Sequence, residues 1–208
     1  ESAGSEAYSA LGTNVVYLST KQPARTLMVT STVAGEGTTT TVANLGVTLA
    51  GLGRTVCLVD LNLADPALHR VFGLEGEVGL SSVLLESATL EKATTDTMIR
   101  NLHLVSGGEP VDADELAPVF RDGTYVDRLR EIYDFVILDT PAVGSAEVAS
   151  IVGPVMDGAL VVVNPTELSS SDFRGALRTL RNSGTAILGT VQNGLSGDRA
   201  SYGKALNT

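Results

Sequence analysis

Residues 32–40, a short stretch containing two glycines, have the composition of a loop that binds phosphate groups. The apolar run 26–31 before them predicts a buried strand, and the residues after them predict a helix that begins around Thr39. A strand, a glycine turn and a helix N-terminus together present backbone N–H groups and a positive dipole end to an anion. In nucleotide-binding loops of this kind, the residue after the last glycine is a lysine that reaches the β- and γ-phosphates. Here that residue is Thr38, so the loop resembles a nucleotide site without its principal charge.

Two aspartates, Asp60 and Asp139, each follow four apolar residues at the end of a predicted strand. An acid in that position holds Mg²⁺ directly or through water in nucleotide sites. Thr39, the first hydroxyl after the lysine position, is the third candidate metal ligand. The alternative is that strand-ending aspartates only cap the next turn. Two such aspartates together with the loop favour the metal site.

Asn193 ends the last predicted strand and is a candidate contact for a nucleotide base. Its amide carries both a donor and an acceptor, which suits a purine edge. Because Gly194 follows it, the pair fits a simple turn equally well.

The elements that must position these residues alternate between strand and helix. Strands are predicted at 26–31, 55–60, 102–106, 135–139, 159–164 and 186–193, and helices at 39–52, 124–133, 145–153 and 170–183. Shorter helices are expected around 66–72 and 80–85, and an added N-terminal helix at about 5–18. Most strand runs are continuously apolar, as in strands covered on both faces. The pattern predicts an α/β fold with a doubly wound, mostly parallel sheet, in which ligands bind at the carboxyl ends of the strands.

Length and charge limit the classes of function. The 208 residues suit one domain, with a core at about 25–195 and a flexible tail at 196–208. A net charge of −10 argues against a nucleic-acid surface and against direct docking on an anionic membrane. No apolar run is long enough for membrane insertion. The chain does not begin with Met, and we expect it to be a piece of a longer protein.

Several segments together resemble one known family, the bacterial tyrosine kinases of capsule and exopolysaccharide co-polymerases. These kinases belong to the wider class of P-loop ATPases that includes the division-site and plasmid-partition ATPases. The resemblance runs from Glu6 to about residue 195. It is carried by EAYSALGTN at 6–14, the stretch 29–84 with PALHRVFGL, YDFVILDTPAV at 133–143 and GTVQNGL at 189–195.

The resemblance implies transfer of the ATP γ-phosphate to tyrosines in a C-terminal cluster, between neighbouring subunits of a ring. It implies that the phosphates are cradled by Gly35, Glu36, Gly37, Thr38, Thr39 and Thr40. Thr39 would hold Mg²⁺, and Asp139 would hold it through its water shell. Asp60 would help bind the metal or activate the tyrosine hydroxyl, and Asn193 would touch adenine. The implied cofactors are ATP or ADP with Mg²⁺. The implied partner is a membrane polysaccharide co-polymerase subunit or an active kinase paralogue, at the cytoplasmic face of a bacterial membrane.

The chain departs from the family at positions that carry charge. Thr38 replaces the loop lysine, Asn62 replaces the second carboxylate of the D-x-D motif, and Ala64 lies near a basic position. In the N-terminal helix the family has Glu-x-x-Arg-x-x-Arg, and Glu6 is followed here by Ser9 and Gly12. The tail of this chain has one tyrosine, Tyr202. A change introduced at Thr38 alone would not explain the other losses.

These losses favour a degenerate kinase-like domain that acts as a non-catalytic scaffold or regulator, with weak or absent nucleotide binding and no ring. Enzymatic activity stays open. One alternative is an active tyrosine autokinase that controls polysaccharide chain length, with a cation supplied by a neighbouring subunit or by Arg54, Arg70 or Arg121. A further alternative is a partition- or positioning-type ATPase, which the acidic charge disfavours.

Overall fold

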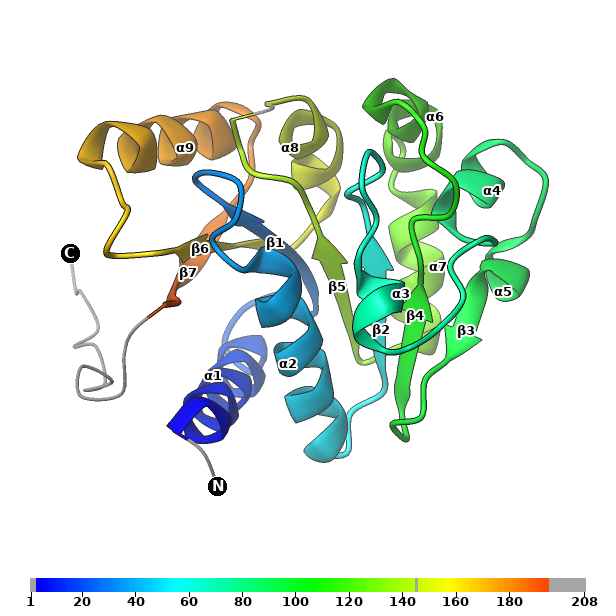
Figure 1. Cartoon of the computed structure of the whole chain (residues 1–208), viewed down its shortest axis with the longest axis horizontal. Coiled ribbons are helices and arrows are strands. Elements are labelled where there is room, and N and C mark those ends of the chain that lie inside the picture. Colours follow the sequence, from blue (N-terminus) through cyan, green and yellow to red (C-terminus); the bar gives the residue numbers. More distant parts are fainter. Residues whose placement is uncertain (1–2, 145, 195–208) are drawn as a thin grey trace.

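A twisted seven-stranded sheet forms the centre of the computed structural model, which describes residues 3–144 and 146–194 (Figure 1). The strand order is β3-β4-β2-β5-β1-β6-β7, and every neighbouring pair is parallel except β3 with β4. The strands are β1 (Thr26–Ser31), β2 (Val56–Asp60), β3 (Thr94–Asp96), β4 (Leu102–Val105), β5 (Phe135–Asp139), β6 (Gly158–Val163) and β7 (Ile187–Gln192). The predicted doubly wound, mostly parallel α/β fold is therefore confirmed.

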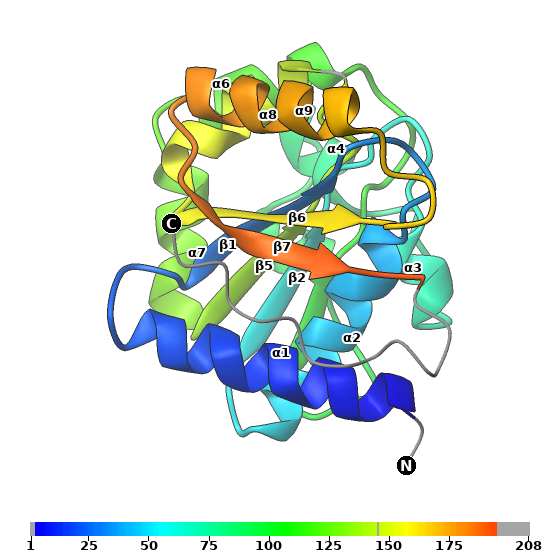
Figure 2. The ribbon, with the colours of Figure 1, turned by 90° about the vertical axis from the view of Figure 1, so that its left-hand side faces the viewer.

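Helices cover both faces of the sheet (Figure 2). One face carries α1 (Ala3–Ser19), α2 (Thr38–Gly51) and α3 (Leu68–Val71). The other carries α4 (Leu80–Leu84), α5 (Leu90–Ala93), η1 (Ala113–Leu116), α6 (Ala117–Phe120), α7 (Thr124–Ile132), α8 (Ala146–Val152), η2 (Gly153–Val155) and α9 (Ser170–Asn182). Successive strand residues point to opposite faces, so Leu27 and Val29 pack under α2 while Met28 joins the other core.

The six predicted strands are all present, and the structure adds a seventh, β3, which the sequence did not reveal. Its three residues, TTD, are polar and half-buried or exposed, so they lack the apolar run that marked the other strands. β3 pairs antiparallel with β4 at the edge of the sheet. The short helices α5, α6 and η1 were likewise not predicted. The predicted tail, 196–208, lies outside the described residues.

The N-terminal helix α1 lies against α2 of its own chain. Val15 is 3% exposed, and Gly12 is buried at the contact. A Cβ atom added at Gly12 would lie 2.5 Å from Cγ2 of Thr48 on α2. Gly12 therefore allows the two helices to approach closely. Within the described residues, no helix is long and apolar enough to cross a membrane.

The strand order brings the predicted site residues to one edge of the sheet. β1 lies between β5 and β6, and β5 lies between β2 and β1. In the register of β2 with β5, Asp60 lies directly opposite Asp139. The phosphate loop follows β1 at the same carboxyl edge, so the loop and both aspartates converge there.

Candidate functional site

The loop between β1 and α2 has the backbone shape of an anion-binding nest. Gly35 and Gly37 both have φ of +89°, a left-handed conformation that other residues rarely adopt. Gly37 is the N-cap of α2 and provides no side-chain cap, so the first N–H groups of the helix remain available. Thr38, at the lysine position, is the first residue of α2. The geometry suits a phosphate, whereas the side chain at this position has no charge.

Glu36 braces the loop from inside. Its side chain is buried, and Oε2 accepts hydrogen bonds from Thr32 N at 2.7 Å, Thr32 Oγ1 at 2.7 Å and Val33 N at 3.0 Å. Its Oε1 accepts one from Asn164 N, at 2.9 Å, beyond the end of β6. Burial opposes ionisation of Glu36, but these hydrogen bonds hold its pKa below the usual value. The carboxylate therefore ties the loop to β6 and points away from solvent.

Asn193, which follows β7, also contacts the phosphate loop. Its Nδ2 donates to Glu36 O at 2.9 Å, and its backbone N donates to Val163 O at 2.9 Å. A Cβ atom at Gly37 would collide with this amide, so only glycine allows the contact. Asn193 thus lies against the phosphate loop, and its contact with adenine stays a prediction.

Asp60 is buried and engaged with its own chain. Its Oδ1 accepts a hydrogen bond from Asn62 N at 3.0 Å, and Oδ2 accepts from Ala67 N at 2.8 Å and Leu68 N at 2.9 Å. The carboxylate thereby caps the start of α3. Burial raises the pKa of Asp60 despite these hydrogen bonds, which act in the opposite direction.

Asp139 is buried without comparable support. The residue is 1% exposed, and its Oδ2 atom has no hydrogen-bond partner. Burial raises the pKa of Asp139 to about 7, the charge of Asp60 adds to this rise, and the Thr39 hydroxyl opposes it. An unpaired buried carboxylate oxygen beside Thr39 is what a divalent cation would satisfy.

The residues present therefore fit Mg²⁺ with a nucleotide phosphate. Asp139 and Thr39 would hold the metal, whose remaining ligands would be water and phosphate oxygens, because Mg²⁺ keeps several waters. Within the described residues, no group of three or more His, Cys, Asp or Glu side chains is placed to hold a metal. Asp60 would need to give up hydrogen bonds to join them.

Within the described residues, none of the three candidate replacement cations forms an ion pair or a hydrogen bond with the loop. Arg54 follows the far end of α2, about 20 Å along a helix of this length. Arg70, on α3, forms an exposed ion pair with Asp65 at 2.9 Å. Arg121 lies between α6 and α7. Within 3–144 and 146–194, no Lys or Arg side chain forms an ion pair with, or donates a hydrogen bond to, a loop residue.

Sequence reasoning did not identify Asn164 and Thr32, which hold Glu36 in place. The available signal was weak. Asn164 follows β6 in the same way that Asn193 follows β7. Its position at the end of a strand was therefore the one available signal. Asn164 contributes through its backbone N–H. Because almost every residue type has this group, the sequence could not identify the contact.

The sheet order, the glycine loop and the strand-end aspartate define a P-loop NTPase. The ParA family, described as NUBPL iron-transfer P-loop NTPase, matches residues 22–201. Tyrosine-protein kinase YwqD of Bacillus subtilis (strain 168) is 34% identical over 195 residues, which make up 93% of this chain and 82% of the kinase. Within the P-loop NTPases, the chain belongs to the bacterial tyrosine kinase family.

Solved structures agree with this assignment. The BceF tyrosine kinase domain superposes with a TM-score of 0.82 at 27% identity, over 91% of this chain and 77% of that domain. The septum site-determining protein MinD from Pyrococcus horikoshii, solved with Mg-ADP, gives a TM-score of 0.66 at 29% identity, over 80% of this chain and 68% of MinD. Membership of the P-loop NTPases implies nucleotide and Mg²⁺ binding.

Proposed function

We propose that this domain is a degenerate tyrosine kinase that serves as a non-catalytic scaffold or regulator in exopolysaccharide or capsule biosynthesis. The observation that carries the proposal is Thr38 at the N-terminus of α2, where a P-loop has its lysine. The loop keeps its left-handed glycines and its internal brace through Glu36. Its shape is thus retained while the charge that catalysis needs is absent.

The magnitudes support weak nucleotide binding and inefficient phosphoryl transfer. Without lysine, the loop offers backbone N–H groups and a helix dipole worth about 0.3–1 kcal/mol at an exposed site. Removing one preorganised donor from a catalytic site typically costs about 10²–10³ in rate. Asn62 replaces a second carboxylate, and its side chain donates to Asp65 O, so it supports the turn after β2.

The N-terminal helix supports the proposal that the domain has also lost the contacts needed to assemble into a ring. Gly12 is buried against Thr48, and the Ser9 hydroxyl donates to Ser5 O within the helix. These residues stand at the two arginine positions of the family's motif, so neither can contribute a charged intersubunit contact. We propose that a ring built on this motif does not form.

The names of the relatives support a proposal about the biological setting. YwqD is named a tyrosine-protein kinase, as is CpsD of Streptococcus pneumoniae serotype 4, which is 30% identical over 200 residues. We propose that the domain works at the cytoplasmic face of a bacterial membrane, bound to a polysaccharide co-polymerase subunit or to an active kinase paralogue. Its retained fold would supply the contacts.

Nucleotide titration tests the loss of catalysis. The purified protein is titrated with ADP or ATP and Mg²⁺, thermal stabilisation is followed, and phosphotyrosine is measured. We expect binding weaker than about 100 µM, or roughly 5 kcal/mol, and no phosphotyrosine. Tight binding with phosphate transfer would show that the domain is an active autokinase.

A lysine variant tests whether the rest of the site is intact. Thr38→Lys restores the missing charge, and Val47→Lys adds the same charge at an exposed position further along the same helix. We expect Thr38→Lys to tighten nucleotide binding about tenfold or more, because a placed cation contacts the phosphates, and Val47→Lys to change it much less. An equal response from both variants would mean that the gain is non-specific attraction.

A further inference from the structure

A groove on the side of the molecule that carries α4–α7 is unconnected with the phosphate loop. It has a volume of about 560 Å³ and lies between residues 83–92 and residues 118–128. Its apolar lining includes Val83 and Val119, which are half-buried, and the side chains of Leu90 and Tyr125, which are 8% and 6% exposed. This lining gives an apolar side chain somewhere to bind.

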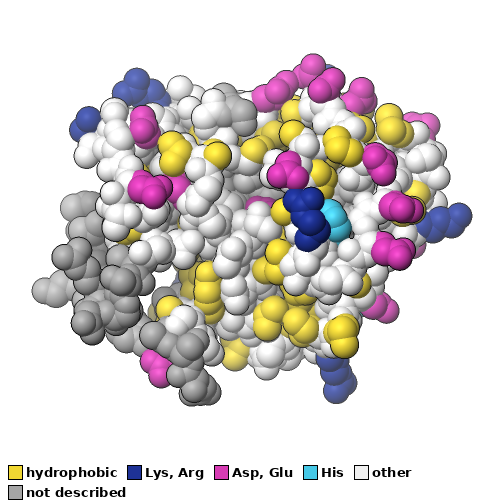
Figure 3. All heavy atoms as spheres, in the orientation of Figure 1, with side chains coloured by type: hydrophobic (Ala, Val, Ile, Leu, Met, Phe, Trp, Pro, Cys, Tyr) yellow, Lys and Arg dark blue, Asp and Glu magenta, His cyan; other side chains and the backbone are white. Residues whose placement is uncertain are grey.

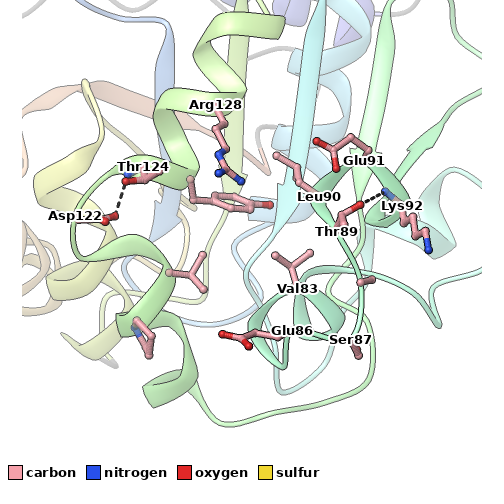
Figure 4. A pocket seen from close by; sticks show the side chains of 14 residues that line it. Val83, Glu86, Ser87, Thr89, Leu90, Glu91, Lys92, Asp122, Thr124 and Arg128 are labelled. Atoms are coloured by element: carbon pink, nitrogen blue, oxygen red, sulfur yellow. Dashed lines mark hydrogen bonds between the residues drawn. The ribbon is translucent and has the colours of Figure 1, made fainter.

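The groove also contains charged groups of both signs (Figure 4). Glu86, Glu91 and Asp122 supply three carboxylates, and Lys92 and Arg128 supply two cations. Arg128 extends from α7 toward the middle of the groove, with Glu86 on the wall across from it. Within the described residues, neither Arg128 nor Lys92 forms an ion pair. The carboxylates outnumber the cations, so the groove itself is weakly negative.

The segment of the chain that contains most of the groove residues carries a much larger negative charge. Residues 75–122 contain ten acidic and three basic side chains, a net charge of −7 out of −10 for the whole chain. Asp and Glu side chains accordingly line the rim of the molecule over this region, as Figure 3 shows. Nearby, contact with Asp114 and the charge of Asp112 raise the pKa of Glu147, as expected where carboxylates lack neutralising partners.

Tyr125 also lines the groove, but its hydroxyl lies beneath the surface, on the side of Cys57 and Tyr133. At the groove surface, the apolar lining and the acidic rim coincide at one place.

We propose that this groove docks a basic amphipathic segment of another protein. An apolar side chain of the segment would cover Val83, Val119 and Leu90, and its Lys or Arg side chains would lie beside Glu86, Glu91 and Asp122. This arrangement follows the general pattern of an amphipathic segment in an apolar groove with a complementary charged rim. The sign of the rim excludes nucleic acid and an anionic membrane as the occupant.

A defined probe tests the proposal without knowledge of the natural partner. The probe is a short synthetic peptide with leucines at helical spacing and lysines elsewhere, titrated by calorimetry and by amide chemical-shift mapping. We expect binding that weakens as salt increases, with shift changes concentrated at residues 83–92 and 118–128. A peptide with glutamate in place of lysine should not bind. Shift changes elsewhere, or equal binding of the acidic peptide, would overturn the proposal.

Matched charge variants locate the contact. Glu86→Gln with Glu91→Gln removes two exposed groove carboxylates, and we expect about 3- to 10-fold weaker peptide binding. Glu6→Gln with Glu167→Gln removes two exposed carboxylates on other elements and should leave binding within about twofold. Equal weakening by both pairs would mean that only net charge attracts the peptide, which would overturn a groove site.

Two other occupants give distinguishable results. If a second copy of this chain fills the groove, light scattering will show salt-sensitive self-association that the Glu86→Gln and Glu91→Gln pair abolishes. If residues 195–208 of the same chain fill it, a chain ending at residue 194 will bind the probe peptide more than tenfold tighter. Either result would overturn a partner segment as the natural ligand.

Discussion

Asp60 and Asp139 end neighbouring strands and lie opposite each other in register, yet their carboxylates have different surroundings. Asp60 accepts three backbone hydrogen bonds and caps α3. Asp139 keeps a buried oxygen with no partner, beside the first turn of α2. The same sequence pattern, an acid after an apolar strand, has therefore produced one aspartate that supports the fold and one that keeps an unpaired buried oxygen.

The largest expected effect is on folding stability, from Asp60→Ala. The substitution leaves the N–H groups of Asn62, Ala67 and Leu68 without their acceptor. Because each buried unpaired donor costs about 1–3 kcal/mol, partly offset by relief of a buried charge, we expect a loss of about 3–5 kcal/mol. Chemical denaturation measures it. Asp60→Asn retains one acceptor oxygen and should cost less. A loss below about 1 kcal/mol for Asp60→Ala would contradict the structural role assigned to Asp60.

Asp139→Asn should act in the opposite direction, and its effect should depend on pH. Burial raises the pKa of Asp139 to about 7, whereas the unfolded chain releases this proton near pH 4. The folded state therefore holds a proton that the unfolded state has lost, so stability falls as pH rises from about 4 to 7. Asn cannot ionise, and we expect the variant to gain about 2–4 kcal/mol over the wild type at pH 8.

Denaturation at pH 5 and pH 8 separates this gain from any general change in packing. At pH 5 the wild-type carboxyl is protonated when folded, so the two proteins should differ much less. A difference that is the same at both pH values would show that Asp139 does not titrate as its burial implies.

The fold could be predicted from the sequence much more fully than the state of the site. Six apolar strand runs and the helices between them fixed the parallel sheet, because burial on both faces requires continuous apolar sequence. The loop glycines and both aspartates were located for the same reason, since topology brings strand ends together. The roles of the aspartates could not be separated, because the difference lies in backbone N–H groups of residues 62, 67 and 68 and in the turn that delivers them.

A double-mutant cycle gives the third prediction, with a smaller effect. The negative charge of Asp60 contributes to the raised pKa of Asp139. Neutralising Asp60 in Asp60→Asn should therefore reduce the gain from Asp139→Asn. We expect a coupling of about 0.5–2 kcal/mol at pH 8, as for adjacent residues in one network. Additive effects would mean that the two carboxylates, although opposite in register, are energetically independent.

The smallest effect is expected from Thr39→Val, which removes the hydroxyl that opposes the rise in the pKa of Asp139 while keeping the shape of the side chain. Without this partner the buried carboxylate is less well supported, so we expect a loss of about 0.5–1.5 kcal/mol at pH 8, typical of one hydrogen bond. In the Asp139→Asn background the same substitution should cost less, because no charge remains to be stabilised.

NMR titration of the Asp139 carboxyl should show its pKa moving further upward in Thr39→Val. The equivalent change at Thr40, which is exposed on the same turn, should leave that pKa unchanged. A similar shift from both substitutions would place the influence in the helix N-terminus as a whole, and the contrast between a supported Asp60 and an unsupported Asp139 would then rest on hydrogen bonds to backbone alone.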